Sequence, residues 1–212
     1  MVKGLLTGGG VDFLASRIFV AVGTQLPFDR LIRTIDEWAS KEGRTGIFAQ
    51  IANASYVPKH MESSAFISPK EFRQRTEEAD VVIAHAGMGT IITALELGKP
   101  VLVMPRLARL GEQRNDHQLA SARAFLKHGR IAVAWDEAEL LDHLRGIDDL
   151  AAADELLRKE ADPRLVDTIR DFLDGKLDPK SLAVAEKAAD PKPAAWSWKV
   201  GSAVSMWRQR VS

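Results

Sequence analysis

The fold of this chain is decided by the stretch DVVIAHAGMGT, which runs from Asp80 to Thr90. Its first half is a continuous apolar run that predicts a buried strand over residues 80–85. A turn with two glycines follows, and the residues from about Thr90 to Leu97 favour a helix. A strand that is apolar on both faces and leads at once into a helix is typical of a parallel sheet covered on both sides. The stretch therefore predicts one strand and helix unit of an α/β protein.

Strand and helix signals alternate on both sides of this unit. Short apolar runs predict further strands at 18–22, 47–51, 65–67, 101–104 and 131–134. Helical spacing or helix-forming composition predicts helices near 28–38, 69–78, 115–127 and 137–144. Crossover helices pack back onto the sheet that they connect. We therefore expect a doubly wound, mostly parallel, Rossmann-like α/β domain over residues 17–146, with its ligand site beyond the carboxyl ends of the strands.

The rest of the chain has a different character. Residues 1–16 precede the domain as an N-terminal arm. Residues 147–174 predict a helical extension, 175–195 a linker rich in Pro, Lys and Ala, and 196–212 an amphipathic helix with three of the five tryptophans. This last helix has three interpretations: it docks on its own domain, lies in a membrane interface, or fills the groove of a partner.

Composition narrows the class of protein. The 212 residues include 29 Lys and Arg against 29 Asp and Glu, so the net charge is zero, which argues against a nucleic-acid binder. The chain has no cysteine, which excludes disulfides and thiolate chemistry. No apolar run approaches the roughly 18 to 20 residues that span a bilayer, and residues 1–16 do not resemble a signal peptide. We expect a cytoplasmic protein.

The glycine-rich turn is the first candidate site. Gly87 and Gly89 let a ligand approach the backbone closely, and the free N–H groups at the start of the next helix favour an anion such as a diphosphate. The dinucleotide pattern G-x-G-x-x-G is absent, because Ile92 stands where the third glycine would be. The alternative is a tight turn without a ligand, in which Thr90 is a simple helix cap and Met88 packs against the core.

Two further segments are candidates at the same edge of the sheet. Gly23-Thr24-Gln25 follows the first strand, and a turn without a ligand explains it equally well. Residues 111–118, GEQRNDHQ, bring eight residues without an aliphatic side chain to the start of a helix. Amides and carboxylates at a cleft mouth suit the hydroxyl groups of a sugar. Alternatively, Asn115 or Asp116 caps the helix and the other side chains are solvated.

The sequence lacks the residue patterns that other classes of catalysis need. The five histidines show no pair at metal-ligand spacing. No Asp-x-Asp pair is present to hold a divalent ion, and no Gly-x-Ser-x-Gly elbow provides a serine nucleophile. We therefore expect neither a metal ion nor a cofactor.

Three ordered runs carry a family resemblance: IFVAVGTQLPFDRL, ADVVIAHAGMGTIITALELGKPVLVMPR and GEQRNDHQLASA. Together they closely resemble the nucleotide-sugar-binding C-terminal domain of family 28 glycosyltransferases, over residues 17–145. The most similar form is the stand-alone domain of two-component bacterial exopolysaccharide glycosyltransferases and of the eukaryotic dolichol-linked chitobiose-forming N-acetylglucosamine transferase. The resemblance implies the donor half of a GT-B fold, whose acceptor-binding half is another polypeptide.

The resemblance also implies roles for individual residues. It places the diphosphate of a UDP-sugar at Gly87, Met88, Gly89 and Thr90, the donor sugar and ribose at Asn115, Asp116, His117 and Gln118, and the acceptor side of the cleft at Gly23 and Thr24. Relatives such as the peptidoglycan-forming enzyme hold the ribose with a glutamate on the helix after the turn. Thr93 occupies that position here, and Glu96, one helical turn away, is the substitute candidate.

The activity that the resemblance implies is a UDP-sugar-dependent, metal-independent, inverting hexosyl transfer to a lipid-linked acceptor in exopolysaccharide synthesis. The implied partner is a membrane-anchored, acceptor-binding subunit that can also supply the catalytic base. The chain would then lie peripherally at the inner face of the cytoplasmic membrane. One alternative is a non-catalytic UDP-sugar-binding or regulatory subunit. The other is a UDP-sugar epimerase, which normally needs both lobes in one chain and more than 212 residues.

Overall fold

The computed structural model describes residues 15–127 and 131–151. The chain divides into two compact units, Met1–Val166 and Asp167–Ser212, and all described residues belong to the first. The elements in chain order are β1 Ile18–Ala21, α1 Asp29–Glu42, β2 Ile47–Gln50, β3 Glu62–Ser64, α2 Pro69–Glu78, β4 Val81–His85, α3 Met88–Glu96, β5 Val101–Met104, the 3-10 turn η1 Ala108–Leu110, α4 His117–Lys127, β6 Ile131–Val133 and α5 Glu137–Arg145.

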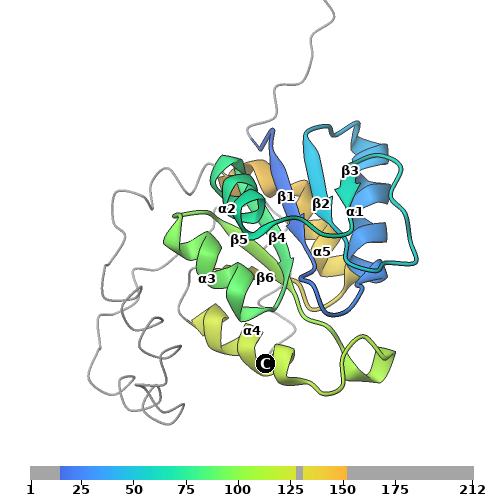
Figure 1. Ribbon diagram of the computed structural model, residues 1–212, viewed down its shortest axis with the longest axis vertical. Helices are drawn as coiled ribbons and strands as arrows, with labels where there is room; N and C mark the ends of the chain where they lie inside the picture. The colour runs from blue at the N-terminus through green and yellow to red at the C-terminus, as the bar shows by residue number, and fades with distance from the viewer. Residues whose placement is uncertain (1–14, 128–130, 152–212) are drawn as a thin grey trace, which may run out of the picture. The chain divides into compact units, whose positions relative to one another are not determined.

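The strands form one six-stranded parallel sheet in the order β3-β2-β1-β4-β5-β6 (Figure 1). Ile18 in β1 pairs with Ile47 of β2 on one side and with Val81 of β4 on the other. The chain order reverses between β1 and β4, and α/β sheets bind ligands at such a switch point. The predicted doubly wound, Rossmann-like α/β sheet is therefore confirmed.

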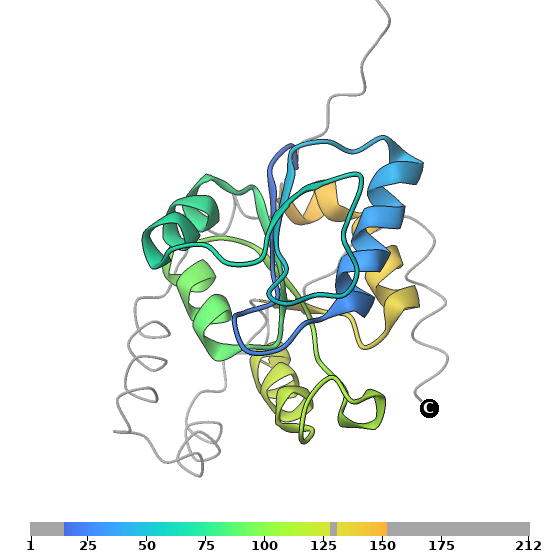
Figure 2. The same cartoon turned by 45° about the vertical axis from the view of Figure 1, so that its right-hand side comes forward.

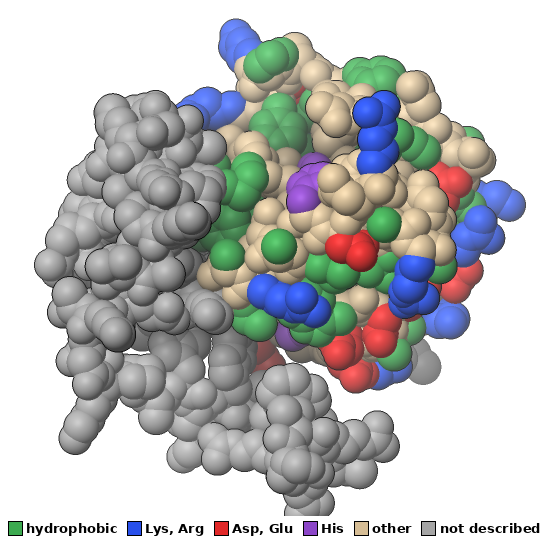
Figure 3. Space-filling view, turned by 90° about the horizontal axis from the view of Figure 1, so that it is seen from below, with side chains coloured by type: hydrophobic (Ala, Val, Ile, Leu, Met, Phe, Trp, Pro, Cys, Tyr) green, Lys and Arg blue, Asp and Glu red, His purple; other side chains and the backbone are tan. Residues whose placement is uncertain are grey.

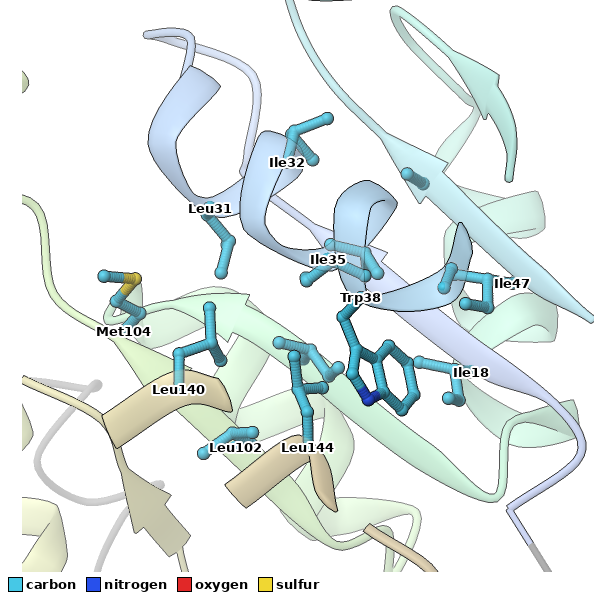
Figure 4. Packing of buried hydrophobic residues seen from close by; sticks show 14 of the residues in the cluster. Ile18, Leu31, Ile32, Ile35, Trp38, Ile47, Leu102, Met104, Leu140 and Leu144 are labelled. Atoms are coloured by element: carbon cyan, nitrogen blue, oxygen red, sulfur yellow. The ribbon is translucent and has the colours of Figure 1, made fainter. Parts of the chain in front are cut away.

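Helices cover both faces of the sheet, with α1 and α5 on one side and α2 and α3 on the other (Figure 2). Alternate residues of each strand enter opposite layers. Val81 and Ile83 of β4 pack in the cluster that contains α1 and α5, whereas Val82 packs with α3. In the first cluster, Trp38 of α1 and Leu144 of α5 lie side by side over the sheet (Figure 4). Burial on both faces explains why these strands are apolar throughout.

Local signals determine where the helices begin and end. Ser68 accepts a 3.1 Å hydrogen bond from the backbone N–H of Glu71 and caps α2. Asp136 caps α5 in the same way, accepting from the N–H of Glu139 at 2.9 Å. The helix α1 ends at Gly43, which has a positive φ of 64° that a glycine adopts without strain.

Several predicted boundaries differ from the structure. The strand expected at 65–67 lies instead at Glu62–Ser64, an exposed edge strand with polar residues, so its position carries no apolar signal. The helix expected from Thr90 begins at Met88, and the one expected from residue 115 begins at His117. The turn η1 was not predicted.

Most of the predicted flanking segments lie outside the described residues. These are the N-terminal arm, the linker at 175–195 and the amphipathic helix at 196–212. Of the helical extension predicted at 147–174, only residues 147–151 are described, and they are helical. Within the described parts of the chain, no helix has the length and apolarity needed to cross a bilayer.

Candidate functional site

The loops after β1 and β4 both close onto the side chain of His85, the last residue of β4. A Cβ atom on Gly87 would lie 2.1 Å from Nε2 of His85, and one on Gly23 would lie 2.8 Å from Cε1 of the same ring. Gly23 also has a φ of 79°, which disfavours other residues. Both loops therefore need glycine where they meet the imidazole, and the two predicted glycine-containing segments lie together at the switch point.

The N-terminus of α3 presents amide groups without a side-chain cap. Gly87 is the N-cap residue, so it offers no side-chain oxygen, and the first turn holds no acidic residue. The first hydrogen bond of the helix runs from the N–H of Ile91 to the carbonyl of Gly87. The N–H groups of Met88, Gly89 and Thr90 precede it and have no acceptor within the helix. Together with the helix dipole they form a favourable environment for an anion.

Thr90 and Gly89 have different environments within this first turn. Thr90 is 6% exposed and lies inside the helix, so the interpretation of Thr90 as a simple cap is wrong. Gly89 is exposed, and a Cβ atom there would meet nothing within 4 Å. The backbone of the turn is therefore open to a ligand at Gly89.

His85 is a neutral imidazole at the base of this turn. Its Nδ1 lies 3.3 Å from the carbonyl oxygen of Ala21, which can only accept a hydrogen bond, so Nδ1 carries the proton and Nε2 the lone pair. Burial, and then the positive charge of Arg106, lower the pKa of His85 to about 4. At neutral pH, Nε2 can accept a hydrogen bond from a hydroxyl group. Sequence reasoning examined the histidines only as metal ligands and missed this placement.

The four residues 115–118 lie in two different environments. Gln118 is 3% exposed, and its Oε1 accepts a 3.0 Å hydrogen bond from the backbone N–H of Arg106. The amide nitrogen of Gln118, Nε2, can still donate a hydrogen bond. Asn115, Asp116 and His117 are exposed at the start of α4.

Both interpretations of residues 115–117 remain compatible with this geometry. Asn115 Oδ1 accepts from the backbone N–H of His117 at 3.3 Å and also contacts Nδ1 of its ring. Asp116 accepts from the backbone N–H of Ala108 at 3.0 Å, which fixes the turn η1. The bond from His117 N–H to Asn115 is typical of a residue that caps a helix start. The exposed polar atoms of the three side chains can still face a sugar.

Glu112, from the same polar stretch, already has partners. Arg30 of α1 donates to both of its carboxylate oxygens, at 2.7 and 2.8 Å, and the backbone N–H of Leu107 donates to it at 2.9 Å. A second carboxylate, Glu137 at the start of α5, accepts from Arg30 at 3.1 Å. Glu112 therefore fixes the loop after β5 and is not a free acceptor for a ligand.

The two ribose candidates on α3 lie at different distances from the start of the helix. Thr93 Oγ1 donates a 2.9 Å hydrogen bond to the carbonyl of Gly89, one turn from the helix start. Glu96 is the last residue of α3, which places it about 12 Å along the axis from Met88 at 1.5 Å per residue. The structure does not bring Glu96 to the edge of the sheet where the other candidates gather.

Figure 3 shows the face toward which the carboxyl ends of the strands point. On the part of this face that the described residues form, basic, acidic and apolar side chains are interspersed. A separate groove of about 480 Å³ lies between α1 and α5, and none of the predicted site residues lines it. Within residues 15–127 and 131–151, no group of His, Asp or Glu side chains is arranged to hold a metal ion.

Comparison with known proteins supplies the family. The model of the glycosyltransferase family 28 C-terminal domain matches residues 17–189. The chain belongs to this family. The resemblance drawn from the three sequence runs is thereby confirmed, and the match extends beyond the predicted residue 145.

Among curated proteins, this family 28 domain is similar to UDP-N-acetylglucosamine transferase subunit ALG13. The human (Homo sapiens) protein is 30% identical and the mouse (Mus musculus) protein 28% identical, each over 125 residues. The match includes 54% of this chain and 10% of each relative. The chain therefore spans about a tenth of the length of the curated relatives that it matches.

Three solved structures illustrate the range of similar folds. The solution structure of ALG13 is 20% identical, with a TM-score of 0.45 over 61% of this chain and 84% of that one. MurG from Acinetobacter baumannii is 20% identical, with a TM-score of 0.46 over 73% and 49%. The glycotransferase of kitacinnamycin is 20% identical, with a TM-score of 0.49 over 88% and 47%.

Proposed function

We propose that this domain is the donor-binding, catalytic half of a two-component glycosyltransferase that moves a sugar from a UDP-sugar to a lipid-linked acceptor. The observation that carries the proposal is the start of α3, where the N–H groups of Met88, Gly89 and Thr90 are uncapped at the switch point of the sheet. A diphosphate is an anion of suitable size and charge for such a site. Family membership supports sugar transfer as the reaction.

In the proposed reaction, the acceptor hydroxyl attacks the anomeric carbon of the donor from the side opposite UDP, and the carbon inverts. The bond from that carbon to the phosphate oxygen breaks, so negative charge accumulates on the departing UDP. The amides at the start of α3 donate to this charge without having to reorganise. Removal of one such fixed donor costs roughly 3 to 4 kcal/mol of transition-state stabilisation in well-studied enzymes. No metal ion is needed in this scheme.

The acceptor-binding half is proposed to be a membrane-anchored subunit, which would also provide the catalytic base. The similarity to a human protein named as a transferase subunit supports this arrangement. Membrane proximity of the acceptor would then place the chain at the inner face of the cytoplasmic membrane. Residues 196–212, with three tryptophans among basic residues, are the candidate segment for contact with that membrane or subunit.

Calorimetry with UDP and with UDP-N-acetylglucosamine tests donor binding. Gly89→Val introduces a branched side chain where the turn is open, so it should weaken UDP binding at least tenfold with little change in stability. Lys70→Val is the matched control, because Lys70 is likewise the second residue of its helix, α2. No heat of binding with the wild-type chain, or equal loss in both variants, would contradict the diphosphate site.

Turnover separates a catalytic subunit from a regulatory one. Membranes that contain the proposed anchored subunit and a lipid-linked acceptor should convert UDP-sugar only when this chain is added, and excess EDTA should not reduce the rate. UDP binding without added turnover would instead indicate the regulatory role. Deletion of residues 196–212 should abolish recruitment to these membranes and leave UDP binding intact; unchanged recruitment would refute the role proposed for this segment.

A further inference from the structure

Arg106 closes the base of the loop between β1 and α1. It stands two residues after β5, and 2% of its surface is exposed. Its Nη2 donates hydrogen bonds to the carbonyl oxygens of Val22 at 2.7 Å and Leu26 at 2.5 Å. These two carbonyls flank Gly23 and Thr24. One guanidinium group therefore joins both ends of residues 22–26, which we call the cleft loop.

Arg106 is itself held from two directions. Its backbone N–H donates to Oε1 of Gln118 at 3.0 Å, and its guanidinium carbon lies 5.1 Å from the centre of the Phe28 ring. Gln118 belongs to α4, and Phe28 directly precedes α1. The end of a strand, the cleft loop and the polar start of α4 therefore meet on one side chain.

The positive charge of Arg106 has no carboxylate in contact among the described residues. Glu112, the acidic group that acts on it, accepts two hydrogen bonds from Arg30, and Nε of Arg106 is buried without a partner. Burial lowers the pKa of Arg106 to about 10, so the group stays charged at neutral pH. A buried cation without a contacting anion is unfavourable, and an anion bound nearby offsets that cost.

Arg106 is also connected to the glycine-rich turn through His85. Its charge reaches His85, whose ring occupies the space between Gly23 and Gly87. The cleft loop, His85 and the start of α3 thus pack together, and Arg106 bonds the two ends of that loop. Displacement of the loop would remove the packing of Gly23 against the imidazole, and that ring also lies against the turn on which the diphosphate is proposed to bind.

We infer that Arg106 is a positioning residue, which holds the cleft loop beside the start of α3 and presents its charge to the bound diphosphate. This inference rests on the proposed function and adds a residue to it. The role needs both the reach of the planar guanidinium group, whose Nη2 bonds two carbonyls, and its positive charge. Lysine retains only the charge, and glutamine retains neither.

Two variants and one control test this role in the full chain. Arg106→Lys should raise the Kd for UDP at least tenfold and Arg106→Gln at least thirtyfold. Both should speed amide hydrogen exchange of residues 23–26 at least tenfold. Arg44→Lys is the control: Arg44 is also a buried arginine, but it binds Asp148 and follows the C-terminal end of α1, away from the cleft loop. It should leave the Kd within twofold of the wild type and the exchange of residues 23–26 unchanged.

The outcomes distinguish this inference from the proposed function. If wild-type chain binds no UDP, the proposed function fails, and the presentation of charge fails with it; the exchange data still decide whether Arg106 holds the loop. Unchanged exchange in both variants, or a wild-type Kd in Arg106→Lys, overturns the positioning role. Equal Kd values in the two variants overturn the role of charge. If neither variant folds, UDP should slow exchange of residues 23–26 in the wild type at least tenfold, and no slowing would overturn the inference.

Discussion

The hydroxyl group of Tyr56 donates a 2.7 Å hydrogen bond to Asp36, a carboxylate that is 1% exposed in the middle of α1. The backbone N–H groups of Lys59 and His60 donate to the same side chain at 3.0 and 2.7 Å. Burial acts to raise the pKa of Asp36, but these hydrogen bonds outweigh it, and the pKa is lowered. One carboxylate thus organises the long loop between β2 and β3.

Asp36→Asn should destabilise the protein and loosen this loop. The variant loses the charge and turns an amide group toward backbone donors, which should cost about 2 to 4 kcal/mol in the free energy of unfolding. Urea unfolding measures the loss, and limited proteolysis should cut within residues 52–61. Asp29, on the same helix, accepts from the exposed N–H of Ser55, and Asp29→Asn should cost less than about 1 kcal/mol. Equal effects of the two variants would contradict the special role of Asp36.

Gly87 and Gly89 should respond in opposite ways to replacement by alanine. A Cβ atom at Gly87 would collide with His85, so Gly87→Ala should lower the free energy of unfolding by about 1 to 3 kcal/mol. Gly89→Ala meets open space inside a helix and should be neutral or stabilising by up to about 1 kcal/mol. Urea unfolding of both variants provides the test. A stable Gly87→Ala protein would show that the imidazole can move without cost.

The stability of the protein should fall between pH 6.5 and pH 4 because of His85. The pKa of His85 is about 4 in the folded chain, against an ordinary value of 6.5. Below pH 6.5 the unfolded chain therefore binds a proton at His85 that the folded chain does not bind, so unfolding becomes more favourable as the pH falls. The effect approaches about 1.4 kcal/mol per pH unit across this window.

A variant without a titrating group isolates this contribution. His85→Asn keeps a donor for the carbonyl of Ala21 but cannot be protonated. Between pH 7 and pH 4, the stability of the wild type should fall relative to this variant by up to about 3 kcal/mol in urea unfolding. A parallel dependence in both proteins, or an NMR titration of His85 near 6.5, would show that the ring is solvated.

The pair Arg30 and Glu112 should contribute more to stability than an exposed pair. Their side chains are 12% and 13% exposed, and two hydrogen bonds join them. A double-mutant cycle with Arg30→Met and Glu112→Gln should give a coupling of about 1 to 3 kcal/mol. The same cycle on Arg145 and Asp142, which are 65% and 73% exposed, should give less than about 0.5 kcal/mol. Equal couplings would mean that burial adds nothing here.

The sequence predicted the architecture well because its signals are local. The run around Val81 to Ala84 is apolar throughout, as a strand buried on both faces must be, and the strand that contains it is one of the two central strands of the sheet. The prediction failed at Glu62–Ser64, because an edge strand with exposed polar residues has no apolar pattern. It also began α3 at Thr90, although the N-cap is Gly87, where no side chain marks the helix start.

Some features of the candidate site could likewise be predicted from adjacent residues, and others could not. The uncapped amides of Gly89 and its neighbours follow from a glycine-rich turn before a helix, which can be read from adjacent residues. Adjacent residues do not show that Glu96 lies far from that turn, or that Glu112 is bound by Arg30. They depend on where the helix ends and on which elements the fold packs together.

By itself, the order of apolar runs and glycines determined that this chain forms a doubly wound parallel sheet with an open helix N-terminus at its carboxyl edge. That follows from periodicity, which acts over a few residues. Only the tertiary structure decided that His85 fills the gap between two loops and that Arg106 reaches Val22. The last contact joins residues 84 positions apart. It exists because packing of the sheet brings the ends of β1 and β5 to one edge and leaves buried polar groups there that must bond to one another.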